Sequence, residues 1–238
     1  MKTSPRRIAV IPARGGSKRV PKKNIKEFAG VPSVIRTIEV LLASSIFDQV
    51  VVSSDSQEIL DLVSNTRTEK VVRPQELSLD STPTVPVIGH AIHSLSLDPE
   101  TFICCVYPVN PFLDKASILT GLELLQLHNE VDYVCPVVSY PYPPQRALTR
   151  NESHVLHFEN PNFAWTRSQD LKELFHDAGQ WYWGRAKSWS AGNAMLNNTL
   201  GIVIPRWMSQ DIDTEEDWAY AELLFEVLQI RRENLKAH

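Results

Sequence analysis

Short apolar segments alternate with segments of helical period over residues 8–138, and this rhythm constrains the fold more than any other feature of the chain. The apolar runs that suit buried strands are residues 8–12, 49–53, 70–73, 101–107 and 132–138. The intervening segments that suit helices are residues 34–42, 56–63, 84–95 and the stretch after Asp114, with Ser56 and Asp114 as caps. Such alternation predicts an α/β fold, with a mostly parallel sheet, helices on both faces and right-handed crossovers.

The rhythm breaks near residue 140, where prolines crowd residues 141–144. Residues 145–185 then carry many aromatic and charged side chains without a clear period. We therefore expect a single domain over residues 1–238 with an inserted arm at residues 140–185, extending toward a partner subunit. A buried strand at residues 200–204 and a final amphipathic helix, capped by Thr214, are predicted to complete the fold.

Charge and composition exclude several kinds of protein. The net charge is −4, so the chain as a whole has no nucleic-acid footprint. No apolar stretch reaches the length of a membrane span, and the N-terminus lacks an apolar signal region. The three cysteines, Cys104, Cys105 and Cys135, form no CxxC pair and are expected to be buried free thiols. We expect a cytoplasmic protein that binds neither nucleic acid nor membrane.

A basic, glycine-bearing loop follows the first predicted strand. Its cationic side chains are Arg14, Lys18, Arg19, Lys22 and Lys23. The glycines at 15 and 16 allow a sharp turn whose N–H groups can form an anion nest. Ligands of open α/β sheets bind at the carboxyl ends of strands, so the loop is predicted to hold a polyphosphate. The alternative is a solvated basic loop, since neither common phosphate-loop spacing is present.

Two acidic residues near the C-terminus form the second candidate site. Asp211 and Asp213 are two positions apart, so in an extended segment their carboxylates point to the same side. Paired oxygens suit Mg²⁺, which keeps several waters and shares phosphate oxygens. The alternative is that both aspartates only cap the final helix.

Residues 11–24 (IPARGGSKRVPKKN) resemble the signature loop of the CMP-N-acetylneuraminic acid (CMP-sialic acid) synthetase family. The resemblance extends over about residues 7–225. It implies a single-domain, Rossmann-like fold of the nucleotide-diphospho-sugar transferase type, a homodimer, and Mg²⁺ held by Asp211 and Asp213. It implies a loop that binds the triphosphate of CTP. The nucleotide contacts implied are Ala13, Arg14, Gly15, Gly16, Ser17, Lys18, Lys23, Asn24, Arg73 and Thr84. Of the residues in the two sites, Arg14, Lys18, Lys23 and Asp211 are the implied catalytic groups.

Further segments extend this resemblance. Residues 73–77 (RPQEL) are similar to the segment that reads the base, where Arg73 and Thr84 would face the cytosine. Residues 107–113 (YPVNPFL) are similar to the turn that lines the sugar pocket, although relatives usually carry threonine and a small residue in place of Val109 and Asn110. The role of Asp55, at the end of the second strand, is left open: it is either a residue of the site or a residue that stabilises a turn.

The segment at residues 166–184 (TRSQDLKELFHDAGQWYWG) is similar to the pseudaminic acid branch of the family, as are residues 144–148. The implied sugar contacts are Tyr107, Asn110, Arg167, Gln169, His176 and Gln180. Arg167 can grip a carboxylate bidentately. Trp181 and Trp183 are better explained as core packing, with Tyr182 on the opposite face.

The resemblance implies attack of the anomeric hydroxyl of an acidic nine-carbon sugar on the α-phosphorus of CTP, with release of pyrophosphate. No dedicated general base is evident, and Asp211 is a hypothesis for that role. The alternative acceptors are legionaminic acid, N-acetylneuraminic acid and 3-deoxy-manno-octulosonate. The alternative of another class is a non-catalytic nucleotide-sugar sensor.

Overall fold

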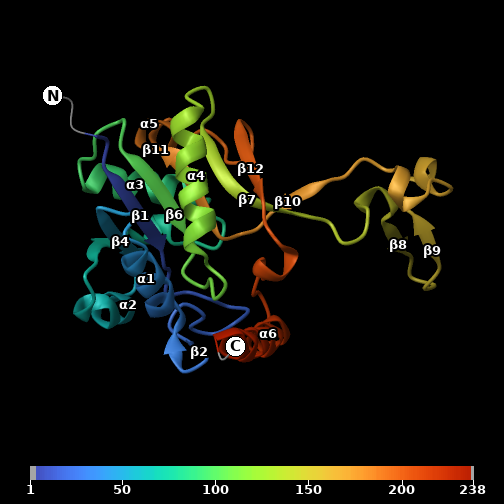
Figure 1. Cartoon of the computed structure of the whole chain (residues 1–238), viewed down its shortest axis with the longest axis horizontal. Coiled ribbons are helices and arrows are strands. Elements are labelled where there is room, and N and C mark those ends of the chain that lie inside the picture. Colours follow the sequence, from blue (N-terminus) through green and yellow to red (C-terminus); the bar gives the residue numbers. More distant parts are fainter. Residues whose placement is uncertain (1–3, 237–238) are drawn as a thin grey trace.

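An eight-stranded sheet forms the centre of the molecule in the computed structural model, which describes residues 4–236 (Figure 1). Its parallel half contains β1 (Arg7–Pro12), β4 (Gln49–Ser54), β5 (Glu69–Val72) and β6 (Phe102–Val106). The strand order is β10-β7-β11-β6-β1-β4-β5, with β12 paired to β7. These four parallel strands are the ones that the apolar runs predict, and the mostly parallel α/β fold is confirmed.

The other half of the sheet is mixed. It contains β7 (Tyr133–Ser139), β10 (Phe175–Asp177), β11 (Trp181–Arg185) and β12 (Thr199–Val203). β11 runs antiparallel to both β6 and β7, between which it lies. Residues 175–185 therefore belong to the central sheet, although we expected them in the inserted arm. All five residues of β11 are buried, so the strand lacks the alternation of exposed and buried positions that marks a half-exposed strand.

Helices cover both faces of the sheet. They are α1 (Ser33–Ser44), α2 (Gln57–Leu62), α3 (Thr84–Ser94), α4 (Lys115–Leu127), α5 (Ala186–Ser190) and α6 (Glu215–Lys236). The apolar sides of α1, α2 and α4 pack on one face of the sheet, and those of α3 and α5 pack on the other. Consecutive residues of β1 alternate between these two cores, as a strand buried on both sides requires.

β11 also alternates between the two cores, as predicted. Trp181 and Trp183 lie in the core under α1 and α4, and Tyr182 lies in the opposite core. The Trp183 indole N–H donates to the Ile118 carbonyl at 2.9 Å. Gly121 of α4 leaves room for the Trp181 ring, because a Cβ at this position would overlap it. The interpretation of both tryptophans as core residues is confirmed.

The helix caps expected from the sequence are present. The Ser56 side chain accepts the Ile59 N–H, and the Asp114 side chain accepts the Ser117 N–H at 2.9 Å. Before α6, the Thr214 hydroxyl accepts the Asp217 N–H at 3.1 Å, while the Asp217 carboxylate accepts the Thr214 N–H at 2.8 Å. These reciprocal bonds form a capping box. The three cysteines are buried free thiols, as expected.

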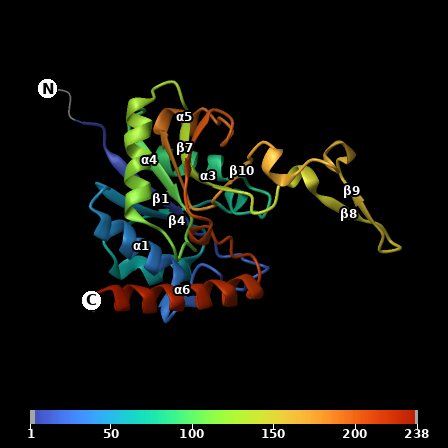
Figure 2. The same ribbon diagram turned by 45° about the vertical axis from the view of Figure 1, so that its right-hand side comes forward.

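α6 lies along one end of the body, next to the loop that follows β1 (Figure 2). Its Trp218 and Ala221 pack in a small core with Val20, Phe28 and Ile212. Phe28 belongs to a two-residue strand, β2 (Glu27–Phe28), that pairs with β3 (Val31–Pro32). This core therefore joins the basic loop, residues near 212 and the last helix into one packed unit.

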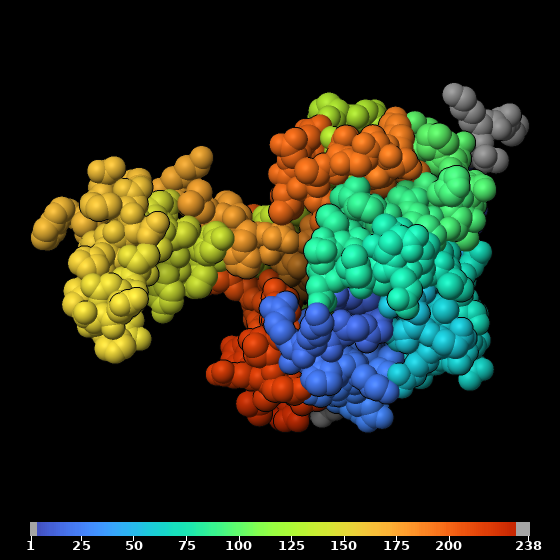
Figure 3. All heavy atoms as spheres, turned by 180° about the vertical axis from the view of Figure 1, so that it is seen from behind, coloured from blue at the N-terminus to red at the C-terminus, as the bar shows by residue number. Residues whose placement is uncertain are grey.

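A long segment leaves the sheet after β7 and returns at β10. It carries a hairpin of β8 (Leu148–Arg150) and β9 (Leu156–Phe158), and it stands apart from the body (Figures 1 and 3). The Tyr140 N–H donates to the Leu174 carbonyl at 3.2 Å, so the two ends of this arm meet at the sheet. We use "arm" below for residues 141–173.

β12 differs from its expectation. The sequence predicts a buried strand, whereas β12 pairs only with β7 in the described sheet and has Val203 62% exposed. An apolar run does not distinguish an edge strand from a central one, so the prediction of burial was wrong. None of the helices within residues 4–236 combines the length and the apolar character that crossing a membrane requires.

Candidate functional site

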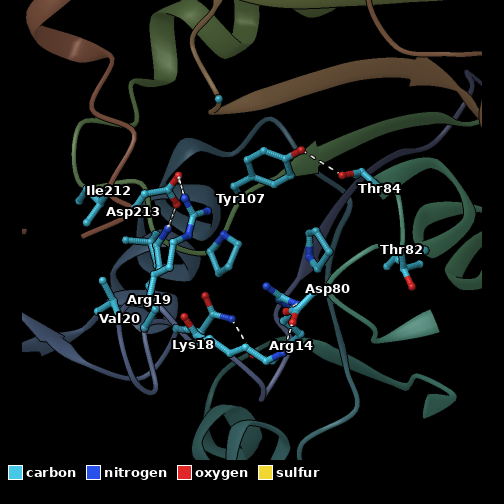
Figure 4. Close-up of a pocket in the computed structure, with 18 of the residues that line it drawn as sticks. Arg14, Lys18, Arg19, Val20, Asp80, Thr82, Thr84, Tyr107, Ile212 and Asp213 are labelled. Carbon is cyan, nitrogen blue, oxygen red and sulfur yellow. Dashed lines mark hydrogen bonds and ion pairs between the residues drawn. The ribbon is translucent and has the colours of Figure 1, made fainter. Parts of the chain in front are cut away.

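A cavity of about 620 Å³ opens at the carboxyl ends of β1, β5 and β6 (Figure 4). Its lining comes from the basic loop, from several residues between 73 and 87, from residues 107–109, from Gly179 and from residues 210–213. Among the predicted nucleotide and metal residues, those that line it are Arg14, Ser17, Lys18, Lys23, Asn24, Arg73, Thr84, Asp211 and Asp213. The fold thus brings the early basic loop and the late aspartate pair to one cavity.

The basic loop is held in place by its own backbone and by the next strand. The Ala13 N–H donates to the Ser53 carbonyl at 2.9 Å, and the Asn24 amide donates to the Arg14 carbonyl at 2.8 Å. The Gly15 N–H donates to the Asp55 carboxylate at 3.0 Å. A Cβ at Gly15 would lie 2.8 Å from the Ser56 Cβ, so this close approach requires glycine.

Arg73 is the most buried cation of the site, with its side chain 3% exposed. It faces the Asp55 carboxylate at 3.4 Å. Burial lowers the pKa of Arg73, and the charge of Asp55 opposes that effect. Asp55 therefore contacts both the Gly15 turn and Arg73. It holds the site in shape, a role that the sequence had left open.

Two cations of the loop converge on Asp80, which the sequence analysis did not single out. Arg14 and Lys18 each approach one oxygen of this carboxylate at 2.5 Å. The hydrogen bonds from Lys18 and then Arg14 lower the pKa of Asp80. Asp80 itself lines the cavity. Nothing in the spacing of the sequence distinguishes it from an ordinary loop aspartate, because its partners are more than sixty residues away.

The late aspartates meet the other cations of the loop. Asp213 pairs with Arg19 at 2.7 Å and with Lys23 at 3.5 Å. Burial, followed by the nearby charge of Asp213, raises the pKa of Asp211. Two neighbouring carboxylates whose charges oppose each other are suited to a divalent cation, which relieves their repulsion.

The donor set also fits Mg²⁺ in particular. Within the described residues no three or more histidine, cysteine, aspartate or glutamate side chains gather as a ready metal site. Two carboxylates completed by water and phosphate make an oxygen sphere of the kind that Mg²⁺ prefers, and Asp211 and Asp213 would be those carboxylates.

Tyr107 and Thr84 form the far wall of the cavity (Figure 4). Their hydroxyl groups are 3.0 Å apart. Burial raises the pKa of Tyr107 to about 12, so its hydroxyl stays protonated and able to donate a hydrogen bond. The predicted sugar contact Tyr107 is thus placed beside the predicted base contact Thr84.

Other predicted residues do not line the cavity. These residues include Ala13, Gly15 and Gly16 of the basic loop, and also Asn110 and Gln180, which are 6% and 3% exposed. The Asn110 amide nitrogen and the Gln180 amide oxygen are buried without a hydrogen-bond partner among the described residues. An unpaired buried amide costs about 1–3 kcal/mol, so both are available to a ligand that reaches them.

The remaining sugar candidates lie farther out. His176 is in β10, where its ring hydrogen-bonds the Asp177 carbonyl at 2.9 Å. Arg167 and Gln169 belong to the arm, and Arg167 pairs there with Asp170 at 2.8 Å. The structure does not bring these two arm residues to the cavity of their own chain.

Comparison with known proteins gives matches over most of the chain. A profile of the family described as Cytidylyltransferase matches residues 8–182. The chain is 35% identical to a pseudaminic acid cytidylyltransferase of Campylobacter jejuni, over 92% of this chain and 96% of the relative. It is 27% identical to a CMP-N,N'-diacetyllegionaminic acid synthase of Legionella pneumophila, over 93% of this chain and 97% of the relative.

A solved structure has the same fold. It is a CMP:2-keto-3-deoxy-manno-octonic acid synthetase complexed with CTP, with a TM-score of 0.69 and 15% identity. The match covers 93% of this chain and 98% of that chain. At this identity the likeness establishes the shared architecture of the sheet and its helices.

Proposed function

The chain belongs to the cytidylyltransferase family, and on that basis we propose that it transfers CMP from CTP to pseudaminic acid, with release of pyrophosphate. One observation carries this proposal beyond family membership. The cations Arg14, Lys18 and Lys23 and the carboxylates Asp211 and Asp213 line a single cavity, although about two hundred residues separate them in sequence. Such an arrangement can hold a nucleotide triphosphate from two sides.

The reaction forms a bond between the anomeric oxygen of the sugar and the α-phosphorus of CTP. It breaks the bond from that phosphorus to the bridging oxygen, and pyrophosphate leaves with the electron pair. Arg14, Lys18 and Lys23 neutralise charge on the triphosphate and on the leaving group. Arg73 and Thr84 orient the base, which aligns the reacting atoms.

Asp211 and Asp213 are the residues that would hold Mg²⁺. When bound, Mg²⁺ supplies electrophilic polarisation of the phosphate oxygens. We propose Asp211 as the carboxylate that accepts the proton of the attacking hydroxyl, because it lines the cavity and forms no ion pair within the part of the chain that the structure describes.

The sugar is proposed to lie next to Tyr107, with Asn110 and Gln180 behind it. The arm residues Arg167 and Gln169 can serve the same sugar only from a second copy of the chain, because their own arm projects away from the body (Figure 1). We therefore propose a homodimer in which the arm reaches the partner subunit. The product would supply cytoplasmic enzymes that decorate bacterial flagellin or surface polysaccharide.

The test is release of pyrophosphate from CTP in the presence of Mg²⁺ and one acidic sugar at a time. Pseudaminic acid is expected to give the highest kcat/KM, ahead of legionaminic, N-acetylneuraminic and 3-deoxy-manno-octulosonic acids. A higher kcat/KM for legionaminic acid would mean that legionaminic acid is the substrate, while the proposed reaction would stand. CTP binding without pyrophosphate release from any sugar would favour a nucleotide-sugar sensor.

A further inference from the structure

Asp80 lies between two cations that the proposed function assigns to the triphosphate. One oxygen of its carboxylate is 2.5 Å from the Arg14 guanidinium, and the other is 2.5 Å from the Lys18 ammonium (Figure 4). All three side chains line the same cavity. The carboxylate therefore engages both cations at once, and a bound phosphate that contacts both would compete with it.

The contacts of Asp80 suit a group that can be displaced. Its side chain is 45% exposed, and the hydrogen bonds and ion pairs described for it all go to Arg14 and Lys18. The turn that carries it is closed independently of the carboxylate, because the Thr82 N–H donates to the Leu79 carbonyl at 3.0 Å. Exposed ion pairs of this kind are individually weak, whereas a triphosphate brings several anionic oxygens at once, each able to form a charge-assisted contact with arginine or lysine.

The two other carboxylates near these cations behave differently. Asp55 is only 17% exposed, and it also accepts the Gly15 N–H, so it is fixed to the loop itself. Asp213 pairs with Arg19 and Lys23 at the other end of the cavity, where it is proposed to coordinate the metal ion. Asp80 is thus the carboxylate that must give way when a phosphate reaches Arg14 and Lys18.

We propose that Asp80 acts as an internal competitor for the anions that bind Arg14 and Lys18. It holds Arg14 and Lys18 while the cavity is empty, yields them to the triphosphate, and takes them back as pyrophosphate leaves. A competitor of this kind lowers the affinity for every anion that needs both cations. The affinity is multiplied by the fraction of molecules in which the two cations are free. The gain is faster release of pyrophosphate. This inference rests on the proposed function, since it assumes that these cations serve phosphates.

The experiment compares the full-length wild-type chain with D80N, which keeps the shape of the side chain and removes its charge. Calorimetric titrations measure the Kd of CTP and, separately, of inorganic pyrophosphate. D80N is expected to bind both about three- to tenfold more tightly, the range that one or two exposed ion pairs correspond to. The inhibition constant of pyrophosphate in the forward reaction should fall by the same factor.

Two further variants separate this role from general charge effects. E76Q removes one negative charge from the same segment, and Glu76 is exposed and has no ion pair among those described, so its Kd values should equal those of the wild type. D80E restores the charge and should return both Kd values to about those of the wild type. If D80N does not fold, D80S makes the same comparison, with folding checked by thermal denaturation.

The outcomes are distinct. Equal or weaker binding of CTP and pyrophosphate by D80N would overturn the inference, because Asp80 would then be inert or a direct contact of the ligand. Tighter pyrophosphate binding by D80N, with no CTP binding by either protein, would support the role of Asp80 and contradict the proposed function. Tighter binding by E76Q to the same extent as by D80N would also overturn the inference.

Discussion

At the scale of single residues, the cations that line the cavity each have a carboxylate partner within the protein. Arg14 and Lys18 face Asp80, Lys23 faces Asp213, and Arg73 faces Asp55. Their partners differ in burial, from the largely buried Asp55 to the half-exposed Asp80. Burial decides which pairs support the fold and which can be exchanged for a ligand, because a buried charge without a partner is costly.

The first prediction concerns the buried pair. Asp55→Ala should lower the free energy of unfolding by about 3 kcal/mol, because it leaves the Arg73 guanidinium uncompensated in a place where it is 3% exposed. Urea unfolding at neutral pH measures this change. In a double-mutant cycle, Arg73→Met with Asp55→Ala should cost less than the sum of the two single changes. A strictly additive result would show that the pair is not coupled.

The second prediction concerns the proposed metal ligands. Asp211→Asn should lower kcat by at least about a hundredfold under saturating Mg²⁺, because it removes one of two anionic oxygens from the metal site. Glu216→Gln is the matched control, since Glu216 is exposed, lies five residues away and removes the same charge. Turnover of Asp211→Asn near that of the control would refute the metal assignment.

At the scale of elements, the core depends on how β11 is inserted and how α4 packs over it. Trp181 of β11 lies against Gly121 of α4, and the adjacent Trp183 is hydrogen-bonded to Ile118 of the same helix. A helix usually loses stability at a glycine, so Gly121 is retained for space rather than for helix propensity.

The third prediction follows from this contact. Gly121→Ala should destabilise the protein by about 1–3 kcal/mol, because its Cβ would overlap the Trp181 ring in a fully packed core. Gly89→Ala in α3 is the control, since its Cβ would meet only the Trp189 carbonyl at 3.8 Å. The control should be neutral or stabilising by about 0.5–1 kcal/mol. Thermal and urea unfolding of both variants decide the matter, and equal effects would contradict the packing argument.

At the scale of the whole molecule, the arm is structurally separable from the body. Its ends meet at the sheet through the hydrogen bond from Tyr140 to Leu174. Large apolar side chains are exposed along it, including Trp165 at 97% and Tyr142 at 82%. These exposures are consistent with the proposal that the arm docks on a second copy of the chain.

The fourth prediction removes the arm. Replacement of residues 141–173 by a short glycine-serine linker should leave a folded body, because the strands on both sides remain paired to the sheet. This variant should bind CTP as the full chain does, sediment as a monomer, and lose turnover with the acidic sugar. Sedimentation velocity and pyrophosphate release measure these properties. A dimer without the arm, or unchanged turnover, would contradict the proposed arrangement.

Much of the architecture was predictable because it depends on local pattern. The parallel strands β1, β4, β5 and β6, the helices between them and the caps at Ser56, Asp114 and Thr214 follow from patterns within a few residues of each other. The location of the basic loop at the mouth of the sheet follows equally from the order of elements. The spacing of Asp211 and Asp213 predicted that they act as a pair, whereas their location beside a loop nearly two hundred residues earlier was implied by the resemblance.

The amino-acid sequence by itself determined the α/β alternation, the basic glycine loop and the membership that these motifs indicate. Only the tertiary structure decided that β11 enters the sheet antiparallel between β6 and β7, that β12 lies at an edge, and that Asp80 faces Arg14 and Lys18. The physical reason is the range of the interactions involved. Strand period, capping and turn formation act over a few neighbouring residues, whereas sheet insertion and the pairing of charges depend on which distant segments the folded core brings together.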